Sequence, residues 1–226
     1  FFKRKRAMCG IAGIASWIER DDSLTVKKMT NLFAHRGPDD FGIKQLKGAC
    51  LGHRRLSIID LTKDGHQPMP DNSKRFWIAF NGEIYGFSSL RKELESIGIS
   101  FNSNSDTEVL VKGFKVWGIN KLCEKINGMF AFAIWDNRDE LLYLARDRFG
   151  EKPLYYLKDG NNIRFSSFSK SLYVDATFSP ELNPDGVVSF LHQGYCGSST
   201  SILRDLKTIA PGSYSIFSKT DQVTKN

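Results

Sequence analysis

Blocks of apolar and polar residues recur along this chain at two periods, which predict a mixture of strands and helices. Short apolar runs bounded by turn residues predict strands at residues 11–14, 41–45, 49–59, 76–80, 129–135, 141–145, 153–157, 163–166 and 213–217. Apolar residues at helical spacing predict helices at residues 24–34, 90–97, 105–117 and 185–192. Short polar connections between residues 129 and 166 predict an antiparallel meander. With no internal repeat or linker, the pattern predicts one α+β domain with antiparallel sheets.

Local signals predict where two of these helices begin or end. Ser105-Asp106-Thr107-Glu108 matches a capping box, in which serine and glutamate side chains satisfy N–H groups at a helix start. After the first helix, Gly37 is expected to supply a left-handed cap and Pro38 to prevent continuation. The polar loop at residues 62–74 carries no chemistry that its residue types identify.

The composition is that of an ordinary globular protein, with 226 residues, 41% of them hydrophobic and 25% charged. No apolar run is long enough to span a membrane, so we expect no membrane partner. The net charge is +7, but residues 3–6 supply four of those seven, and the +3 left on the rest is too little to predict a nucleic-acid partner. The four cysteines form no Cys-x-x-Cys pair and no histidine stands at metal-binding spacing. We therefore expect no metal site, no disulfide framework and a reducing, cytoplasmic setting.

Cys9 directly follows a methionine, which suggests a processed N-terminus. Residues 1–8 are then an extension or a removable leader, with Met8 as the functional start. Once Met8 is removed, Cys9 carries both a thiol and a free α-amine, whose pKa of about 7.7–8 leaves roughly a tenth of it unprotonated at pH 7. One residue would supply both nucleophile and general base. The alternative is an ordinary buried cysteine in an N-terminal strand.

Three further polar positions have two interpretations each. Arg54 and Arg55 point to opposite faces of a strand, so one faces the interior, unless both are solvated near the strand end. Asn81-Gly82 between apolar runs predicts a hairpin turn; alternatively, the Asn81 side chain and the Gly82 N–H form an oxyanion hole. Asp106 in a first helical turn either interacts with the helix dipole or binds the ammonium group of a ligand.

Together these motifs resemble the class II glutamine amidotransferase domain of the N-terminal-nucleophile hydrolases, in the form found in asparagine synthetases. The resemblance runs from Met8 to about Tyr214, nearly the whole chain. Its specificity comes from the order and spacing of the motifs rather than from any one of them. Besides the four motifs above, the agreement includes residues 35–39, 128–133, 145–150, 152–156 and 210–212.

The resemblance implies a four-layer αββα sandwich, in which two antiparallel sheets lie between helices. It implies that residues 9–226 form the amidotransferase domain, with no ATP-using synthetase domain in this sequence. Glutamine is the implied substrate, and a synthetase domain or subunit is the implied partner that receives ammonia. No cofactor is implied for this chain, since ATP and Mg²⁺ are expected only with the synthetase domain. The acceptor of the nitrogen and the formation of homo-oligomers stay open.

The resemblance also assigns the catalytic residues. Cys9 is the implied nucleophile, which attacks the side-chain amide of glutamine and forms a thioester. The side chain of Asn81 and the N–H of Gly82 are implied to hold the developing oxyanion. The alternative function is a catalytically silent module that binds glutamine or docks on a partner, blocked by its N-terminal extension.

The substrate-binding residues follow from the same resemblance. Arg55, which directly precedes Leu-Ser-Ile as in the family pattern, is implied to bind the α-carboxylate. Asp106, helped by Glu83, is implied to bind the α-ammonium. Backbone groups around Leu56 and Ile58 are implied to line the pocket.

Two segments depart from the family pattern. Relatives usually have Ser-Glu-x-Lys after the strand at residues 163–166, whereas this chain has Ser167-Phe168-Ser169-Lys170. Contacts that the glutamate makes in relatives are therefore not expected at Phe168. Gly86-Phe87 replaces an Asn-His type of sequence beside the predicted pocket. We expect this change to alter the pocket rim.

Overall fold

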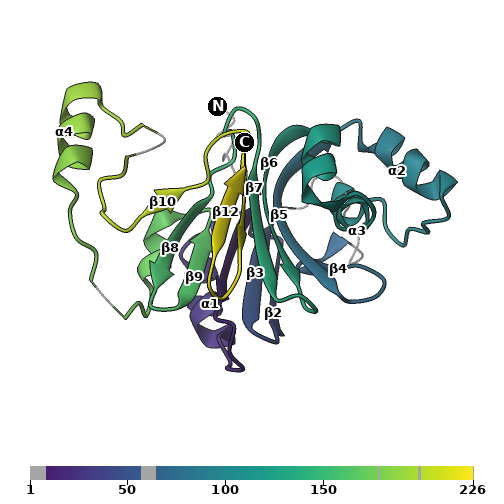
Figure 1. Ribbon diagram of the computed structural model, residues 1–226, viewed down its shortest axis with the longest axis horizontal. Coiled ribbons are helices and arrows are strands. Elements are labelled where there is room, and N and C mark those ends of the chain that lie inside the picture. Colours follow the sequence, from purple (N-terminus) through teal and green to yellow (C-terminus); the bar gives the residue numbers. More distant parts are fainter. Residues whose placement is uncertain (1–8, 57–64, 178, 198–199, 226) are drawn as a thin grey trace.

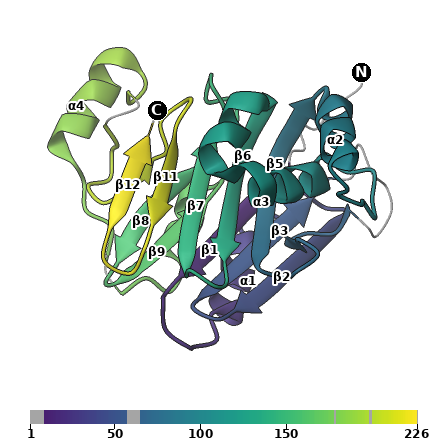
Figure 2. The same ribbon diagram turned by 45° about the vertical axis from the view of Figure 1, so that its right-hand side comes forward.

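The computed structural model describes residues 9–56, 65–177, 179–197 and 200–225. Within these residues the chain forms two six-stranded sheets that pack face to face, with helices on their outer faces (Figures 1 and 2). Neighbouring strands are antiparallel in both sheets. The predicted α+β class and the four-layer sandwich are confirmed.

The first sheet holds the N-terminal strand near its centre. Its strands lie in the order β10 (Lys207–Thr208), β8 (Tyr155–Asp159), β9 (Asn162–Ser166), β1 (Gly10–Ala15), β3 (Ala49–Arg55) and β2 (Asp40–Leu46). Strand β1 is buried at every position because it has a strand on each side and a layer on each face, which accounts for its continuous apolar sequence. Helix α1 (Ser23–Asn31) covers the outer face, where Val26 and Met29 pack against Ile14.

The second sheet carries two helices on its outer face. Its strands lie in the order β12 (Gln222–Lys225), β11 (Tyr214–Phe217), β7 (Leu141–Arg146), β6 (Asn127–Asp136), β5 (Phe76–Tyr85) and β4 (Met69–Pro70). The two helices are α2 (Phe87–Ser96) and α3 (Asp106–Lys125). The predicted start of α3 is confirmed, since the Glu108 N–H donates to the Ser105 Oγ over 3.2 Å. The helix extends past the predicted end to Lys125, across a kink at Gly118 with a φ of 71°.

The space between the sheets is filled by an apolar cluster over much of its length. Leu51 of β3, Ala79 of β5 and Trp135 of β6 are among its fully buried members. Trp135 also contacts Trp17, with ring centroids 6.1 Å apart. This layer is the core that aligns the two sheets.

The predicted meander between residues 129 and 166 is wrong, because the four strands divide between two sheets. Strands β6 and β7 pair in the second sheet, whereas β8 and β9 pair in the first. Asp147, fully buried after β7, organises the crossing by accepting N–H groups from Phe130, Glu151 and Lys152. Short polar connections therefore do not distinguish a hairpin from a crossing between stacked sheets.

The expected left-handed cap at Gly37 is also wrong. Helix α1 ends at Asn31, with Leu32 as its last cap residue, and Gly37 is not among the glycines with positive φ. A Cβ at Gly37 would lie 2.5 Å from the backbone carbonyl carbon of Arg54. The glycine is required by the close approach of strand β3, not by the end of the helix.

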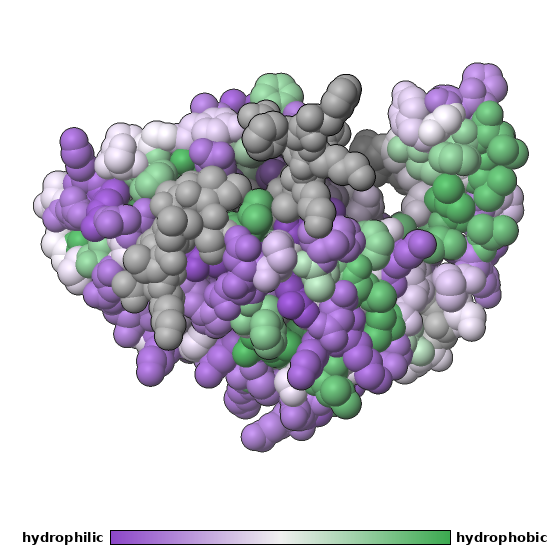
Figure 3. Space-filling view, turned by 180° about the vertical axis from the view of Figure 1, so that it is seen from behind, coloured by the Kyte–Doolittle hydropathy of each residue, from purple (hydrophilic) through white to green (hydrophobic). Residues whose placement is uncertain are grey.

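Helix α4 (Pro184–Gln193) confirms the helix predicted at residues 185–192 but stands apart from the sandwich (Figure 1). A short 3₁₀ helix, η2 (Ser169–Tyr173), precedes it. Apolar side chains of α4 face outward, at the upper right of Figure 3. Val188 is 65% exposed and Leu191 77% exposed, whereas Gly186 is buried. Among the described residues, no helix combines the length and the apolar character that crossing a membrane requires.

Candidate active site

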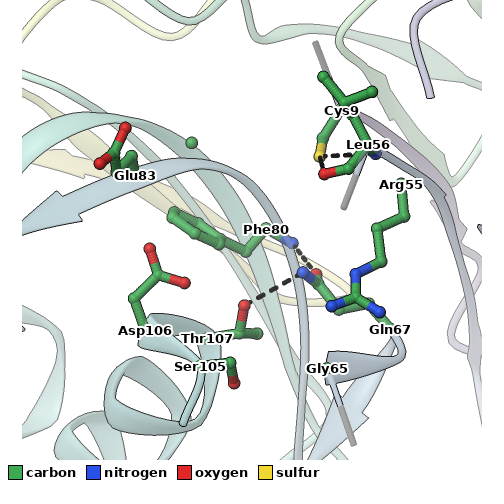
Figure 4. A pocket seen from close by; sticks show the side chains of 11 residues that line it. Cys9, Arg55, Leu56, Gly65, Gln67, Phe80, Glu83, Ser105, Asp106 and Thr107 are labelled. Carbon is green, nitrogen blue, oxygen red and sulfur yellow. Dashed lines mark hydrogen bonds between the residues drawn. The ribbon is translucent and has the colours of Figure 1, made fainter. Parts of the chain in front are cut away.

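A pocket opens at the end of the sandwich where β1, β3, β5 and the start of α3 meet (Figure 4). Its empty volume, counted with its open mouth, is about 520 Å³. The residues that line it are Cys9, Arg55, Leu56, Gly65, Gln67, Phe80, Gly82, Glu83, Ser105, Asp106 and Thr107. Segments far apart in the sequence therefore meet around one cavity.

Cys9 lies at the start of β1, next to the end of β3. Gly10 pairs with Arg54 in the antiparallel register, so Cys9 falls opposite Arg55. The Leu56 N–H donates to the Cys9 Sγ over 3.3 Å, which fixes the sulfur at the pocket wall. The sulfur is thus held by backbone from the strand that also presents Arg55.

Two opposing influences act on the thiol of Cys9. Burial raises its pKa above the ordinary value, because desolvation disfavours the thiolate. The hydrogen bond from the Leu56 backbone and the positive charges of Arg55 and Lys152 act in the opposite direction. Since the net shift is upward, this environment favours a thiol that loses its proton to a base during attack rather than a preformed thiolate.

The two adjacent arginines of β3 point to opposite faces, as their spacing predicts. Arg55 is buried between the sheets and lines the pocket, with Gly65 packed closely against its guanidinium. Arg54 faces α1, where its guanidinium hydrogen-bonds Asn31 and stacks over Phe41 at 4.9 Å. The structure therefore places the predicted carboxylate-binding arginine in the cavity and its neighbour outside it.

The hairpin turn considered for Asn81-Gly82 is wrong, because β5 continues through both residues to Tyr85 and pairs with β6 throughout. A Cβ at Gly82 would lie 2.2 Å from the backbone oxygen of Met129, so only glycine fits there. Asn81 is 1% exposed and its side-chain N–H donates to the Ser167 Oγ over 3.3 Å. Gly82 lines the pocket, whereas Asn81 is not among the residues that line it.

Asp106 and Glu83 make one side of the pocket negative. The Ile84 N–H donates to the Asp106 Oδ2 over 3.1 Å, which positions the carboxyl at the start of α3. Burial, with a smaller contribution from Glu83, raises the pKa of Asp106 to about 6. In Figure 4 these two carboxylates lie at the left and Arg55 at the right, with the sulfur of Cys9 above. A cationic group between the carboxylates would relieve their repulsion.

The sequence did not identify two groups that belong to this site. Gln67 lies in the polar loop at residues 62–74, whose residue types identify no chemistry, yet it is 5% exposed and hydrogen-bonded at both ends of its amide. Lys152 is 6% exposed and interacts electrostatically with Cys9. Local residue types give no signal for either, since burial of a polar side chain depends on the tertiary packing. Ile58, the remaining predicted lining residue, lies outside the described residues.

The two departures from the family pattern occupy different places. Ser167 contacts the site indirectly, because its Oγ accepts both the Asn81 side-chain N–H and the Ile11 backbone N–H. Gly86 is the N-cap residue of α2, with a φ of 64°, and Phe87 begins that helix. Within the described residues, no group of three or more His, Cys, Asp or Glu side chains is arranged to hold a metal ion.

Comparison with known sequences gives one consistent result. A family model described as the glutamine amidotransferase domain matches residues 8–226. Asparagine synthetase [glutamine-hydrolyzing] 1 of Bacillus subtilis (strain 168) is 38% identical over 210 residues, which covers 91% of this chain and 33% of that protein. Putative asparagine synthetase [glutamine-hydrolyzing] 2 of Methanocaldococcus jannaschii is 35% identical over 218 residues, covering 88% and 42%. The chain thus spans about a third of the length of the Bacillus relative.

Comparison with solved structures supports the fold. Glutamine phosphoribosylpyrophosphate amidotransferase from B. subtilis superposes with a TM-score of 0.71, covering 96% of this chain and 49% of that one. The two sequences are 19% identical, so the likeness concerns the architecture. The four-layer sandwich is shared between them.

Proposed function

Because the chain belongs to the glutamine amidotransferase domain family, we propose that it hydrolyses glutamine to glutamate and ammonia through a thioester on Cys9. The observation that carries the proposal is the pocket itself, where a cysteine, a buried arginine and two carboxylates line one cavity. An amino acid has an anionic and a cationic group at one end and, in glutamine, a reactive amide at the other. The charges of the pocket match the first end and the sulfur matches the second.

The proposed reaction begins once Cys9 is the first residue. Its α-amine takes the thiol proton, directly or through a water, and the sulfur attacks the amide carbon of glutamine. The oxyanion that develops is stabilised by the Gly82 N–H and the Asn81 side chain, each such donor typically contributing about 3–4 kcal/mol to the transition state. The protonated amine then gives its proton to the leaving nitrogen, which departs as ammonia. Water, deprotonated by the same amine, hydrolyses the thioester and restores the thiol.

Substrate selection rests on charge. Arg55 pairs with the α-carboxylate of glutamine, and its fork of N–H donors suits a bidentate contact. Asp106 and Glu83 pair with the α-ammonium. Backbone around Leu56 completes the wall near the sulfur, and Ile58 is expected to extend it. Burial of Arg55 and Asp106 strengthens both contacts relative to an exposed site.

We further propose that the ammonia passes to an ATP-using synthetase domain or subunit, which would bind ATP and Mg²⁺. The names of the relatives, glutamine-hydrolysing asparagine synthetases, support aspartate as the acceptor. The acceptor specificity belongs to that partner and not to this pocket. A cytoplasmic location fits the four cysteines, all of them free thiols.

Three forms of the chain test the proposal: one that begins at Cys9, one that keeps residues 1–8, and Cys9→Ala. We expect ammonia release only from the first, and a loss of kcat of at least about 10⁴-fold in Cys9→Ala. Glutamine should still raise the melting temperature of Cys9→Ala, because the binding groups are unchanged. Equal ammonia release with residues 1–8 attached would refute the role of the α-amine. Glutamine binding without ammonia release from the first form would favour the silent binding module.

A further inference from the structure

One edge of β5 loses its neighbouring strand just before the pocket. Strand β4 pairs only with Trp77 and Ile78, and beyond it the described residues place no strand on this side. The backbone N–H and C=O groups of Phe80, Gly82 and Ile84 point to this open edge, because residues along a strand alternate in the side to which they hydrogen-bond, and the partners of Phe80 and Ile84 lie outside β6. The hydrogen bonds of Phe130, which lies opposite Gly82 on β6, support this direction for Gly82. The N–H and the C=O of Phe130 both bind Asp147, on the side of β6 away from β5, so neither bonds to Gly82.

Two buried side chains take the place of the absent strand at Phe80. The Phe80 N–H donates to the Gln67 Oε1 over 2.7 Å, and the His53 Nε2 lies 3.0 Å from the Phe80 carbonyl oxygen. Gln67 is 5% exposed and His53 1% exposed. We call these two side chains the Phe80 clamp. A further strand would satisfy the same backbone groups but would also fill the pocket, whereas these side chains satisfy the Phe80 groups and leave the cavity open.

The chemistry of each clamp residue is determined by its partner. Burial lowers the pKa of His53 to about 3, so the imidazole is neutral and must donate from Nε2 to the carbonyl. The Gln67 amide is held at its other end as well, because its Nε2 donates to the Thr107 Oγ1 over 3.1 Å. Thr107 follows Asp106 in the first turn of α3. The clamp therefore connects the open edge of β5 to the helix that presents Asp106.

We propose that Gln67 and His53 are positioning residues that aim the Gly82 N–H at the developing oxyanion. This inference rests on the proposed glutaminase function. The Phe80 carbonyl and the Gly82 N–H belong to consecutive peptide planes, which are joined only by the φ and ψ bonds of Asn81. Holding the first plane in strand geometry therefore limits the orientations open to the second. On the other side of Gly82, the Ile84 N–H is held by Asp106. The strand edge is thus anchored two residues before and two residues after Gly82, whose own N–H points into the cavity.

The decisive variant is Gln67→Met, which keeps the length and volume of the side chain but removes both hydrogen bonds. Its matched control is Gln45→Met. The side-chain amide of Gln45 is also hydrogen-bonded at both ends, because its Oε1 accepts from the Asp22 N–H and its Nε2 donates to the Arg20 carbonyl. Gln45 lies near the end of β2 that is far from Arg55. In the chain that begins at Cys9, we expect Gln67→Met to lower kcat about 10- to 100-fold with KM changed less than about threefold. Gln45→Met should leave both constants near those of the unmutated chain.

A second measurement separates positioning from a general structural effect. The second measurement uses an aldehyde analogue of glutamine. The Cys9 thiol adds across the aldehyde carbonyl, with the sulfur bonding to carbon and the proton passing to oxygen, and forms a tetrahedral hemithioacetal. Its oxygen lies where the oxyanion develops in the reaction. The affinity for the analogue should fall in Gln67→Met by the same factor as kcat, whereas the affinity for the product glutamate should stay unchanged. A His53→Gln variant, which keeps a side-chain N–H, should retain more activity than His53→Leu.

Unchanged kcat in Gln67→Met, or equal weakening of the aldehyde analogue and glutamate, would overturn the proposal. If Gln67→Met does not fold, the same measurements are made on Thr107→Val. This milder change removes only the hydrogen bond from the Gln67 Nε2 and keeps the bond between the Gln67 Oε1 and Phe80. We expect a kcat loss of about 3- to 10-fold for Thr107→Val with KM unchanged, and no kcat loss would likewise overturn the clamp. Failure of the glutaminase function itself would appear as no ammonia release from the unmutated chain that begins at Cys9.

Discussion

The layer between the two sheets has an apolar half and a polar half, built from the same strands. The inward positions of β3 are Ala49 and Leu51 in the apolar cluster, then His53 and Arg55 towards the pocket. All four are at most 8% exposed. The inward face of the strand is therefore buried along its whole length, and only the chemistry of its side chains changes.

Strand β5 changes in the same direction and at the same end. Trp77 and Ala79 contact the apolar cluster, whereas Asn81 and Glu83 follow on the same face beside the pocket. The apolar half stabilises the sandwich through burial, and the polar half relies on paired charges and hydrogen bonds. The comparison teaches that this fold builds much of its site by replacing core residues at one end of two facing strands, β3 and β5, while loop residues such as Gln67 and the start of α3 complete the pocket.

Among the substitutions that test this comparison, the largest effect on kcat/KM should come from making the polar half apolar at Arg55. Arg55→Leu removes the proposed partner of the α-carboxylate, and we expect kcat/KM to fall about 10²- to 10³-fold, within the about 2–5 kcal/mol typical of a truncated buried charge contact. Steady-state ammonia release measures it. Arg54→Leu is the control, because Arg54 faces α1, and it should change kcat/KM by less than about threefold. Equal losses in the two variants would contradict the assignment.

An intermediate effect is expected for Asp106→Asn. The neutral amide keeps the shape of the carboxylate but loses its attraction for the α-ammonium, so KM should rise about 10- to 100-fold, as expected for a hydrogen bond to a charged group. The pH dependence sharpens this prediction. Because the pKa of Asp106 is raised to about 6, the carboxylate is lost as pH falls through that value, and kcat/KM should fall with it.

The matched profile of Asp106→Asn should lack this limb near pH 6 and keep the fall at higher pH that protonation of the Cys9 α-amine, with a pKa of about 7.7–8, produces. Should the limb persist unchanged in the variant, another group would be titrating. A KM equal to that of the unmutated chain would remove Asp106 from substrate binding.

The smallest effect on turnover should come from the apolar half. Leu51→Ala leaves a cavity in the core between the sheets and should lower the free energy of unfolding by about 2–5 kcal/mol. The kcat/KM of the folded fraction should change by less than about threefold, since distant sites are nearly independent. Urea unfolding and ammonia release at low temperature measure the two quantities. A loss of kcat/KM as large as that of Arg55→Leu would show that the two halves are not separable.

Much of the local structure could be predicted from the residues. Helix α1, the capped start of α3, helix α4 and most strands follow from periodicity and capping signals, because these depend on neighbours in the sequence. The failures are those that depend on distant segments. The strands at residues 129–166 divide between two sheets. Strand β5 continues through Asn81-Gly82 because β6 pairs with the residues before and after that dipeptide.

The sequence by itself indicated most of the chemical groups of the site, the alternation of inward and outward residues, and the family, whose motifs imply Cys9 as a nucleophile. The spacing of Arg54 and Arg55 left open which of them faces the interior; the family resemblance implied Arg55, and the tertiary structure places Arg55 in the cavity. Only the tertiary structure decided that Gln67 supports the open edge of β5. The physical reason is that the two-residue alternation of side chains along a strand places neighbours on opposite faces but does not determine which face another layer covers. That choice is made by the second sheet, whose packing decides which polar groups are buried and which partners they meet.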